Sequence, residues 1–433
     1  MPPEKVAVVG VGYVGLPLAC VLAEAGFQTI GRDVDGQRVQ TINSGRSPIA
    51  GKEPGLEELL GKVVSSGMLR ATTDMQECSG ADAYFVCVDT PIGSDRRPRL
   101  DVLRSVSADI GKVMRRGSLV VIESTLPPGT MHGIVIPLLE KGSGMRAGED
   151  FSVVHCPERV MPGRLLYNMR NYSRVLGGID QGSVERAKHY YSKIIKAELF
   201  SSDLLSTEIS KTAENAYRDV QIAFANEVAL ICEQLGADAF EVRRLVNTCP
   251  FRDMHIPGAG VGGHCLPKDS WLLLSSVDQE EMRIIPGARE VNESMPLHTA
   301  LLAEEALLEA DRPLKDARIS VMGLAFLRDS DDTRNSPSKV IVDHFLERGA
   351  DVIVHDPFVV ERYKVPVERD LRRALLGSDC AIFVTDHSAY RGMDMEVAKD
   401  VMRTLIVVDG RNLFDGPRLV DLGFHYRGVG KKH

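Results

Sequence analysis

The stretch Val6-Ala-Val-Val-Gly10-Val-Gly12-Tyr-Val-Gly15 decides the fold of the first half of this chain. It begins as a short β-branched strand and passes through a Gly-x-Gly-x-x-Gly loop into a helical pattern that ends at Gly26. The first glycine permits the turn, the second lets the backbone approach a pyrophosphate, and the third allows close helix packing. We therefore expect a dinucleotide site formed by Gly10, Gly12, Tyr13, Val14 and Gly15, the alternative being a glycine-rich turn without a ligand.

The next predicted strand bears on the choice of dinucleotide. It ends at Asp33, 18 residues beyond Gly15, where an acid is placed to hydrogen-bond a ribose 2′-hydroxyl. An aspartate there repels a 2′-phosphate, which favours NAD over NADP, although the adjacent Arg32 could pair with that phosphate. Arg38, one turn into the following helix, is either a phosphate contact or a solvated helix arginine.

Length and composition restrict the class of protein. A chain of 433 residues is too long for one hydrophobic core and predicts two or three domains. It contains no run of about 18 apolar residues, so no membrane span is expected, and its first residues lack a signal-peptide pattern, which favours a cytoplasmic location. The net charge of −8 without a long basic cluster argues against nucleic acid. Eight cysteines without CxxC spacing argue against a zinc site, and no metal is predicted.

Hydrophobic patterning predicts an α/β protein with two Rossmann-like parallel-sheet domains joined by a central helical domain. The first domain, 1–200, alternates helical patterns with short β-branched runs at Val6–Gly10, Thr29–Asp33, Ala83–Val88, Leu119–Glu123 and Phe151–His155. The second, 201–310, opens with apolar residues every three or four positions up to Gly236, which predicts one amphipathic helix of about 30 residues. The third, 311–433, resumes the alternation at 318–326, 352–355, 381–385 and 405–409.

A second glycine-rich loop carries the most reactive side chain. It reads Gly258-Ala-Gly-Val-Gly-Gly-His-Cys265-Leu-Pro-Lys-Asp269. Glycines let a backbone close around a ligand without Cβ clashes, and a cysteine at the end of such a loop is placed to attack it. Cys265 is therefore a candidate nucleophile, the alternative being a half-buried thiol in a tight turn.

With these elements in hand, the chain resembles the UDP-glucose/GDP-mannose dehydrogenase family of nucleotide-sugar 6-dehydrogenases over nearly its whole length. The resemblance rests on six ordered segments: Val6–Gly15, Glu123-Ser-Thr-Leu-Pro-Pro-Gly-Thr130, Cys156-Pro-Glu-Arg-Val-Met-Pro-Gly163, Lys211–Asp219, Gly262–Asp269, and Gly323-Leu-Ala-Phe326 with the following Asp331–Pro337. It implies oxidation of a sugar CH₂OH to a carboxylate with two NAD, a UDP-sugar-binding third domain, and a homodimer. It also implies a cofactor contact from Thr90.

The chemistry explains the residue types. An aldehyde cannot give up a hydride until something adds to its carbonyl, and a thiolate adds well, so Cys265 would form a thiohemiacetal and then a thioester. Lys211 and Asn215, four residues apart on the long helix, would stabilise developing negative charge. Asp269 and Thr125 would hold the water that accepts the first proton, and Glu158 would activate the hydrolytic water. Taken singly, each of these residues also has an ordinary structural role open to it.

Further residues bear on the sugar. By resemblance, substrate contacts are expected from Glu158, Arg159, Val160, Lys211, Asn215, Arg218, Arg252, Gly262, Arg334 and Arg411. Arg159, Pro162 and Arg218 match members that act on 2-acetamido sugars, so UDP-N-acetylmannosamine is expected, with UDP-N-acetylglucosamine and UDP-glucose as alternatives. Arg252 is one residue out of register with the corresponding arginine of relatives.

One position departs from the family pattern. Where relatives commonly have a lysine after Gly-Leu-Ala-Phe that reaches the nucleotide sugar, this chain has Leu327 followed by Arg328. Consecutive residues of an extended segment point to opposite sides, so Arg328 is a poor substitute. Two other functions remain open: a two-electron hydroxyacid-type dehydrogenase, which would not need Cys265, and a regulator that binds both ligands without chemistry.

Overall fold

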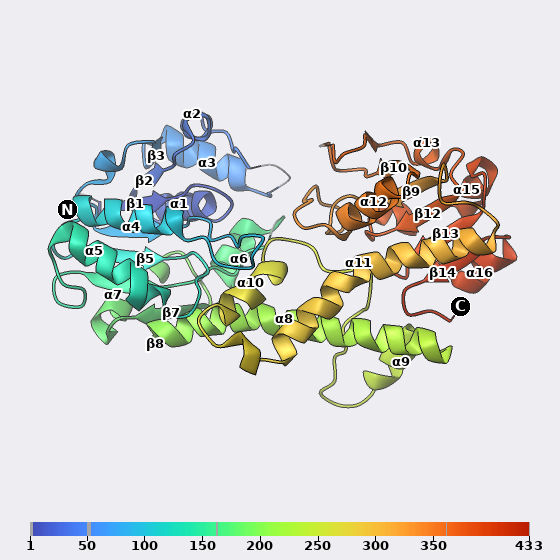
Figure 1. The fold of residues 1–433 in the computed structure, drawn as a ribbon. Helices are drawn as coiled ribbons and strands as arrows, with labels where there is room; N and C mark the ends of the chain where they lie inside the picture. Colours follow the sequence, from blue (N-terminus) through green and yellow to red (C-terminus); the bar gives the residue numbers. More distant parts are fainter. Residues whose placement is uncertain (1–2, 50–52, 162, 361, 433) are drawn as a thin grey trace. The chain divides into compact units, whose positions relative to one another are not determined.

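The computed structural model describes residues 3–49, 53–161, 163–360 and 362–432 and divides the chain into two compact units. Unit 1 comprises Met1–Glu214 and Trp271–Gln279, and unit 2 comprises Asn215–Ser270 and Glu280–His433. Helix α8 (Leu204–Leu235), drawn in green in Figure 1, begins in unit 1 and continues into unit 2. The long amphipathic helix predicted from the sequence is therefore confirmed, with 32 residues. Pro162, one basis of the expected sugar preference, lies outside the described residues.

Unit 1 is built on a sheet with the strand order β3-β2-β1-β4-β5-β6-β7-β8 in the described residues. The strands are β1 (Lys5–Val9), β2 (Gln28–Arg32), β3 (Leu69–Thr72), β4 (Ala83–Val86), β5 (Leu119–Ile122), β6 (Ser152–His155), β7 (Arg174–Gly178) and β8 (Leu199–Asp203). The order from β3 to β6 is that of a doubly wound dinucleotide-binding sheet. β6 and β7 pair antiparallel, which the sequence pattern did not predict.

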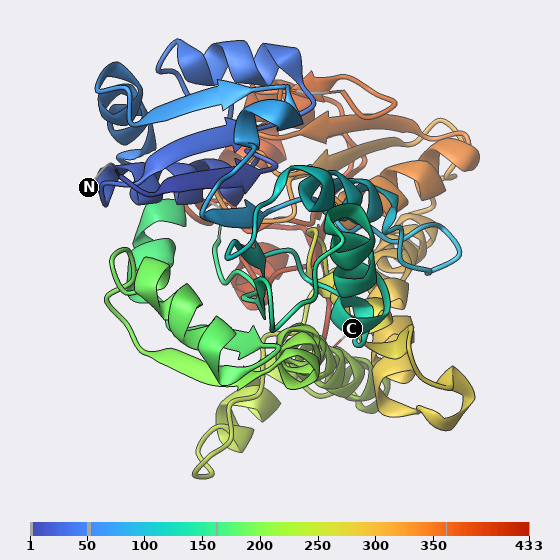
Figure 2. The same ribbon diagram turned by 90° about the vertical axis from the view of Figure 1, so that its left-hand side faces the viewer.

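Helices cover both faces of this sheet, and strands alternate with helices from blue to green in Figure 2. The helical elements are α1 (Gly15–Glu24), α2 (Gly36–Asn43), α3 (Leu56–Ser65), η1 (Met75–Cys78), α4 (Asp101–Val113), η2 (Met131–Val135), α5 (Ile136–Ser143), α6 (Leu165–Asn171) and α7 (Gln181–Tyr191). Alternate residues of each strand point to opposite faces, so Val6 and Val8 of β1 pack with α1, whereas Ala7 and Val9 belong to the core with α4 and α5.

Unit 2 contains a second parallel sheet with the order β11-β10-β9-β12-β13-β14 among its described residues. Its strands are β9 (Arg318–Met322), β10 (Asp351–His355), β11 (Val367–Glu368), β12 (Cys380–Phe383), β13 (Ile406–Asp409) and β14 (His425–Gly428). The four strands predicted from the alternating pattern in 311–433 correspond to β9, β10, β12 and β13. The two-sheet α/β architecture expected from the sequence is therefore confirmed.

The helical elements that follow α8 are α9 (Ala239–Val246), α10 (Leu266–Leu274), η3 (Gln279–Glu281), α11 (Ile284–Glu309), α12 (Pro337–Glu347), α13 (Leu371–Leu375), α14 (Ser388–Arg391), α15 (Met395–Val401) and α16 (Gly416–Asp421). α10 and η3 are divided between the two units, and the others belong to unit 2. α11 and α12 cover one face of the second sheet, and α13, α15 and α16 contribute to the core on the other. Throughout the described ranges, no helix combines the length and apolarity needed to cross a membrane.

Candidate active site

The first glycine loop of unit 1 has the geometry that a dinucleotide requires. Gly10 has φ +89°, and a Cβ at Gly15 would lie 1.9 Å from the carbonyl oxygen of Gly10, so these two glycines serve tight packing. A Cβ at Gly12 would meet no atom of the described residues within 4 Å. The loop is thus open at Gly12 and closed behind it, which is the arrangement that lets a pyrophosphate approach the amino end of α1. Tyr13 and Val14 are both half-buried beside it.

The end of β2 places Asp33 beside this loop. Asp33 is buried, and its Oδ2 accepts hydrogen bonds from the backbone N–H of Val11 and from Nη1 of Arg38, each at 3.0 Å. The partner of Arg38 observed here is thus the aspartate itself. A carboxylate at this position fits a ribose 2′-hydroxyl and repels a 2′-phosphate.

The loops that follow β4 and β5 are joined by their side chains. Thr90, which is buried, donates from Oγ1 to the carbonyl oxygen of Thr125 at 2.6 Å. Ser124 donates from Oγ to the carbonyl oxygen of Val88 at 2.6 Å. Thr125 itself is half-buried. The two predicted site threonines therefore belong to one connected edge of the sheet.

The loop after β6 carries Glu158, Arg159 and Val160, all half-buried. Glu158 accepts a hydrogen bond at 2.5 Å from the backbone N–H of Val160, which folds its carboxylate back over its own loop. The guanidinium of Arg159 forms an ion pair with Glu214 of α8 and donates to the carbonyl oxygen of Ser173 at 3.1 Å. In this structure Arg159 therefore braces the loop.

Lys211 on α8 is buried although it carries a charge at its tip. It lies close enough to His155 at the end of β6 to affect that group electrostatically. Burial lowers the pKa of His155 to about 4, and Lys211 adds to this effect. The ring is then neutral, and its Nε2 donates to the carbonyl oxygen of Ser124 at 3.1 Å.

One residue of α8 escaped the sequence analysis. Glu208 has no exposed surface, and its carboxylate accepts hydrogen bonds from the backbone N–H of Gly129 at 2.7 Å and of Met131 at 2.8 Å. These contacts fix the turn that follows Thr125 and opens the π-helical element η2. The spacing of three residues between Glu208 and Lys211, which puts both on one helix face, was the available signal.

The cysteines differ in their surroundings: five are buried, Cys87 and Cys265 are half-buried, and Cys249 is exposed. Burial raises the pKa of Cys20 and Cys156 to about 12 and that of Cys78 to about 11, so these core thiols stay protonated. Cys265 is half-buried and immediately precedes α10 in unit 2, where its carbonyl oxygen accepts the backbone N–H of Asp269 at 2.8 Å. Cys265 therefore lies at the amino end of a helix.

Unit 2 also joins two of the predicted polar residues directly. Asn215 of α8 donates from Nδ2 to Oδ2 of Asp269 at 2.5 Å, and Lys268 lies 3.3 Å from the other carboxylate oxygen. Asp269 is almost fully buried. Asn215 and Asp269, which lie 54 residues apart in the sequence, are therefore joined, and Cys265 lies one helical turn before Asp269.

The glycine loop before Cys265 packs on an aromatic ring. A Cβ at Gly262 would lie 2.4 Å from the Cβ of Phe326, so only glycine fits there. The backbone N–H of Gly263 donates to the carbonyl oxygen of Arg334 at 2.8 Å, and Asn335 donates from Nδ2 to the carbonyl oxygen of Gly263 at 2.9 Å. The loop and the segment 326–335 are thus held as one piece.

Arg334 and Arg411, which both contact this loop, differ in their exposure to solvent. Arg411 is half-buried and donates to the carbonyl oxygens of Val384 at 2.7 Å and Gly260 at 3.1 Å. Arg334 is exposed, and its guanidinium forms an ion pair with Asp332. Arg411 thus contacts the glycine loop of unit 2 at Gly260, and the backbone of Arg334 contacts it at Gly263.

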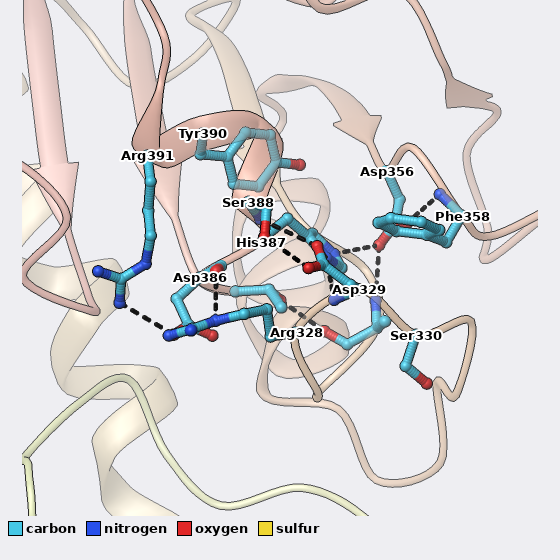
Figure 3. Close-up of polar contacts among 12 residues, drawn as sticks. Arg328, Asp329, Ser330, Asp356, Phe358, Asp386, His387, Ser388, Tyr390 and Arg391 are labelled. Atoms are coloured by element: carbon cyan, nitrogen blue, oxygen red, sulfur yellow. Dashed lines mark hydrogen bonds and ion pairs between the residues drawn. The ribbon is translucent and has the colours of Figure 1, made fainter. Parts of the chain in front are cut away.

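Arg328 is engaged elsewhere, as Figure 3 shows. Its guanidinium pairs with Asp386, which also lies 3.2 Å from Nη2 of Arg391. Asp329, with φ +53°, donates its backbone N–H to Nδ1 of His387, whose Nε2 lies 3.2 Å from Asp356. Arg328 therefore belongs to a local polar network that stabilises the turn.

Two further predicted substrate residues lie on the surface of unit 2. Arg218 is exposed and contributes, after burial and together with Arg243, to a lowered pKa of His255. Arg252 is exposed, and its Nη1 lies 3.4 Å from the carbonyl oxygen of Phe251 in its own loop. Within the part of the chain that the structure describes, no group of three or more His, Cys, Asp or Glu side chains could hold a metal ion.

Comparison with known proteins accounts for both units. Models of the UDP-glucose/GDP-mannose dehydrogenase family match the NAD binding domain at residues 4–195, the central domain at 205–294 and the UDP binding domain at 320–416. The UDP-N-acetyl-D-mannosamine dehydrogenase of Pyrococcus horikoshii is 39% identical and covers 99% of each chain. The NDP-N-acetyl-D-galactosaminuronic acid dehydrogenase of Ralstonia solanacearum is 35% identical over 96% of this chain and 97% of the relative.

Solved structures agree with these sequence matches. The structure of the Pyrococcus horikoshii UDP-D-ManNAc dehydrogenase superposes with a TM-score of 0.93 over 99% of this chain and 100% of that one. An NDP-N-acetyl-D-galactosaminuronic acid dehydrogenase from Methanosarcina mazei, 38% identical, gives 0.90 over 100% and 96%. The chain therefore belongs to the UDP-glucose/GDP-mannose dehydrogenase family and is a nucleotide-sugar dehydrogenase with an NAD-binding domain and a UDP-binding domain.

Proposed function

We propose that this protein oxidises the C6 hydroxymethyl group of a UDP-2-acetamido sugar to the carboxylate in two successive NAD-dependent steps. The observation that carries this proposal is the cluster at the amino end of α10, in which a half-buried cysteine precedes the helix and a buried aspartate of its first turn is bonded to Asn215. A two-electron alcohol dehydrogenase has no need of a nucleophile there. A four-electron enzyme does need one.

The cysteine divides the reaction into steps in which atoms and electrons balance. Loss of a hydride and a proton from the C6 alcohol gives an aldehyde. The thiolate of Cys265 adds to that carbonyl carbon and the oxygen takes up a proton, which gives a thiohemiacetal. Loss of a second hydride together with the hydroxyl proton then gives a thioester. Water then breaks the C–S bond, which releases the carboxylate and restores the thiol. NAD, when bound, accepts the hydride in each oxidation, and the open side of Gly12 together with the Asp33 carboxylate fits it.

The remaining residues handle protons and charge. Asp269, which accepts a hydrogen bond from Asn215, would hold with Thr125 the water that receives the first proton. Lys211 and Asn215 stabilise the negative charge that develops on the sugar oxygen. Glu158 activates the water that hydrolyses the thioester. Each assignment is a proposal supported by the burial and hydrogen bonds described above.

We assign the preferred sugar as UDP-N-acetylmannosamine. Both curated relatives named above act, by their names, on N-acetylated sugars. UDP-N-acetylglucosamine and UDP-glucose are the alternative substrates. Sugar and nucleotide contacts are assigned to Arg159, Val160, Arg218, Arg252, Gly262, Arg334 and Arg411.

The domain boundaries, the oligomeric state and the cellular location are also proposed. We assign 1–200 to the NAD-binding domain, 201–310 to the central domain and 311–433 to the UDP-sugar-binding domain. A homodimer located in the cytoplasm is proposed. The mass of the protein in solution, measured at working concentration by light scattering, tests the dimer, and a monomer would contradict it.

A substrate panel with a stoichiometry measurement tests the proposed reaction. UDP-N-acetylmannosamine, UDP-N-acetylglucosamine and UDP-glucose are each offered with NAD or NADP, and NADH formed is compared with sugar consumed. We expect about two NADH per sugar, the largest kcat/KM with UDP-N-acetylmannosamine, and little turnover with NADP. A ratio near one would reject the four-electron reaction, and binding without any reduced cofactor would favour a regulator.

Two cysteine variants make the test specific to the nucleophile. Cys265→Ala should stall after the first oxidation or turn over only very slowly, because the aldehyde can no longer form a thiohemiacetal. Cys249→Ala removes an exposed thiol of the same unit and should leave the rate unchanged. Full turnover by Cys265→Ala would overturn the proposed mechanism.

A further inference from the structure

A buried ionic network lies behind the two loops of unit 1 that carry Thr125 and Glu158. Glu123, at the end of β5, and Tyr191, at the end of α7, have no exposed surface, and Arg174 of β7 is only 1% exposed. The hydroxyl of Tyr191 donates to Oε1 of Glu123. Nη1 of Arg174 lies 3.4 Å from Oε2 of the same carboxylate.

Charges at this depth are costly to maintain. Removing a carboxylate and a guanidinium from water costs each its hydration, and well-packed apolar residues of similar volume usually stabilise a core at least as well. Burial and, to a smaller extent, Glu158 raise the pKa of Glu123, and Arg174 and Tyr191 act against that rise. Stability by itself therefore does not explain why an ion pair lies in this core. A requirement for fixed orientation does, because hydrogen-bonded ions have few alternative arrangements.

The network reaches both loops through the backbone. Glu123 is directly followed by Ser124 and Thr125, so fixing its side chain fixes the start of that loop. Nη1 of Arg174 also donates to the carbonyl oxygen of Pro157 at 3.2 Å, immediately before Glu158. The backbone N–H of Glu158 lies 3.3 Å from the carbonyl oxygen of Glu123. One guanidinium thus holds the side chain of one loop and the main chain of the other.

We propose that Glu123, Arg174 and Tyr191 are positioning residues that keep the loop of Thr125 and the loop of Glu158 in register with each other. The inference rests on the proposed function for its catalytic consequence. The three side chains have almost no exposed surface, so they would act through Thr125 and Glu158, to which the proposed function gives the catalytic roles. The sequence pattern includes Glu123 but not its partners, since Arg174 lies 51 residues away on a strand that pairs antiparallel with β6.

Tyr191→Phe is the mildest test, because it removes one hydroxyl and leaves both charges and the ring in place. Tyr84→Phe is its matched control: Tyr84 is an equally buried tyrosine of the same unit, and its hydroxyl donates to the carbonyl oxygen of Cys78 at 2.9 Å, outside the network. We expect Tyr191→Phe to lower kcat by about 10- to 100-fold with a smaller change in the KM for the sugar nucleotide, because small displacements of catalytic groups cost such factors. Tyr84→Phe should keep the wild-type kcat.

Hydrogen exchange supplies a readout that does not depend on activity. Backbone amides of residues 124–130 and 156–160 should exchange faster in Tyr191→Phe than in Tyr84→Phe, whereas amides of α4 should exchange equally in both. Arg174→Lys keeps a charge that can still donate to Pro157 and should retain more activity than Arg174→Met. Equal rates for Arg174→Lys and Arg174→Met would contradict a role for the contact with Pro157.

The outcomes separate this inference from the proposed function. If the wild-type protein forms no NADH with any UDP-sugar, the proposed function fails, and the exchange measurement alone decides whether the loops are held by the network. If the wild type is active and the two tyrosine variants match in kcat and in loop exchange, the positioning role is overturned. A loss of thermal stability in Tyr191→Phe without a loss of kcat would likewise identify a purely structural network.

Discussion

Glu208→Gln offers a prediction whose sign and size follow from burial. The wild-type carboxyl has no exposed surface and meets the backbone N–H groups of Gly129 and Met131. Burial is the main cause that raises the pKa of Glu208 from 4.5 to about 7, and the backbone amides partly counteract it. A carboxyl with a raised pKa in the folded state binds its proton more tightly there than in the unfolded chain. Its stabilising contribution is fully present below pH 4.5 and is lost as the pH rises to about 7.

The magnitude follows from linkage. Each pH unit between the unfolded and folded pKa values is worth about 1.36 kcal/mol, so the interval from 4.5 to about 7 corresponds to about 3 kcal/mol. Glutamine has nearly the same shape and does not titrate. The free energy of unfolding of the wild type, minus that of Glu208→Gln, should therefore fall by about 3 kcal/mol between pH 4.5 and pH 8.

The assay follows from where the single tryptophan lies. Trp271 is the only tryptophan of the chain, is nearly buried, and belongs to unit 1 together with Glu208. Urea unfolding followed by its fluorescence therefore reports the unit that contains the substitution. Glu57 is an exposed glutamate of the same unit, and Glu57→Gln is the control. The free energy of unfolding of the wild type, minus that of Glu57→Gln, should change by less than about 0.5 kcal/mol over the same pH range. A difference that stays flat with pH, or grows as the pH rises, would refute the reasoning.

Three further substitutions test other parts of the structure. Gly262→Ala should destabilise unit 2 by about 1–3 kcal/mol, because the new Cβ would overlap Phe326. Unfolding followed by circular dichroism measures this loss, and a second substitution, Phe326→Ala, should recover part of it. Asp33→Asn should raise the affinity for NADP relative to NAD by about tenfold or more, because the like-charge repulsion disappears and Arg38 loses its carboxylate partner. Calorimetric titration with both nucleotides measures the two affinities, and an unchanged ratio would contradict a role for Asp33 in cofactor choice. Arg328→Ala should change the KM for the UDP-sugar by less than about threefold, since its guanidinium is held in an exposed surface ion pair; a large rise in KM would show instead that Arg328 contacts the substrate.

Local patterns made much of the architecture predictable. The β-branched runs of β1, β4 and β5 and the period of α8 are properties of short stretches, so the sequence predicted them within a few residues. β8 was missed because its residues are largely polar and partly exposed, which leaves no apolar signal. The Gly10 loop was predicted because its glycines act within one turn.

What the sequence alone determined were the chemical groups and their order along the chain: the dinucleotide loop, Asp33, the cysteine after its glycine loop, and the two polar residues a helical turn apart on α8. Only the tertiary structure decided their partners. It placed Asn215 on Asp269 and Glu208 on the turn at Gly129, and it put Arg174 under Glu123 through an antiparallel strand. The physical reason is that hydrogen bonds and ion pairs form between atoms within about 3 Å of each other, and burial then sets their strength. Distance in space and depth below the surface are products of the whole fold, which no local pattern contains.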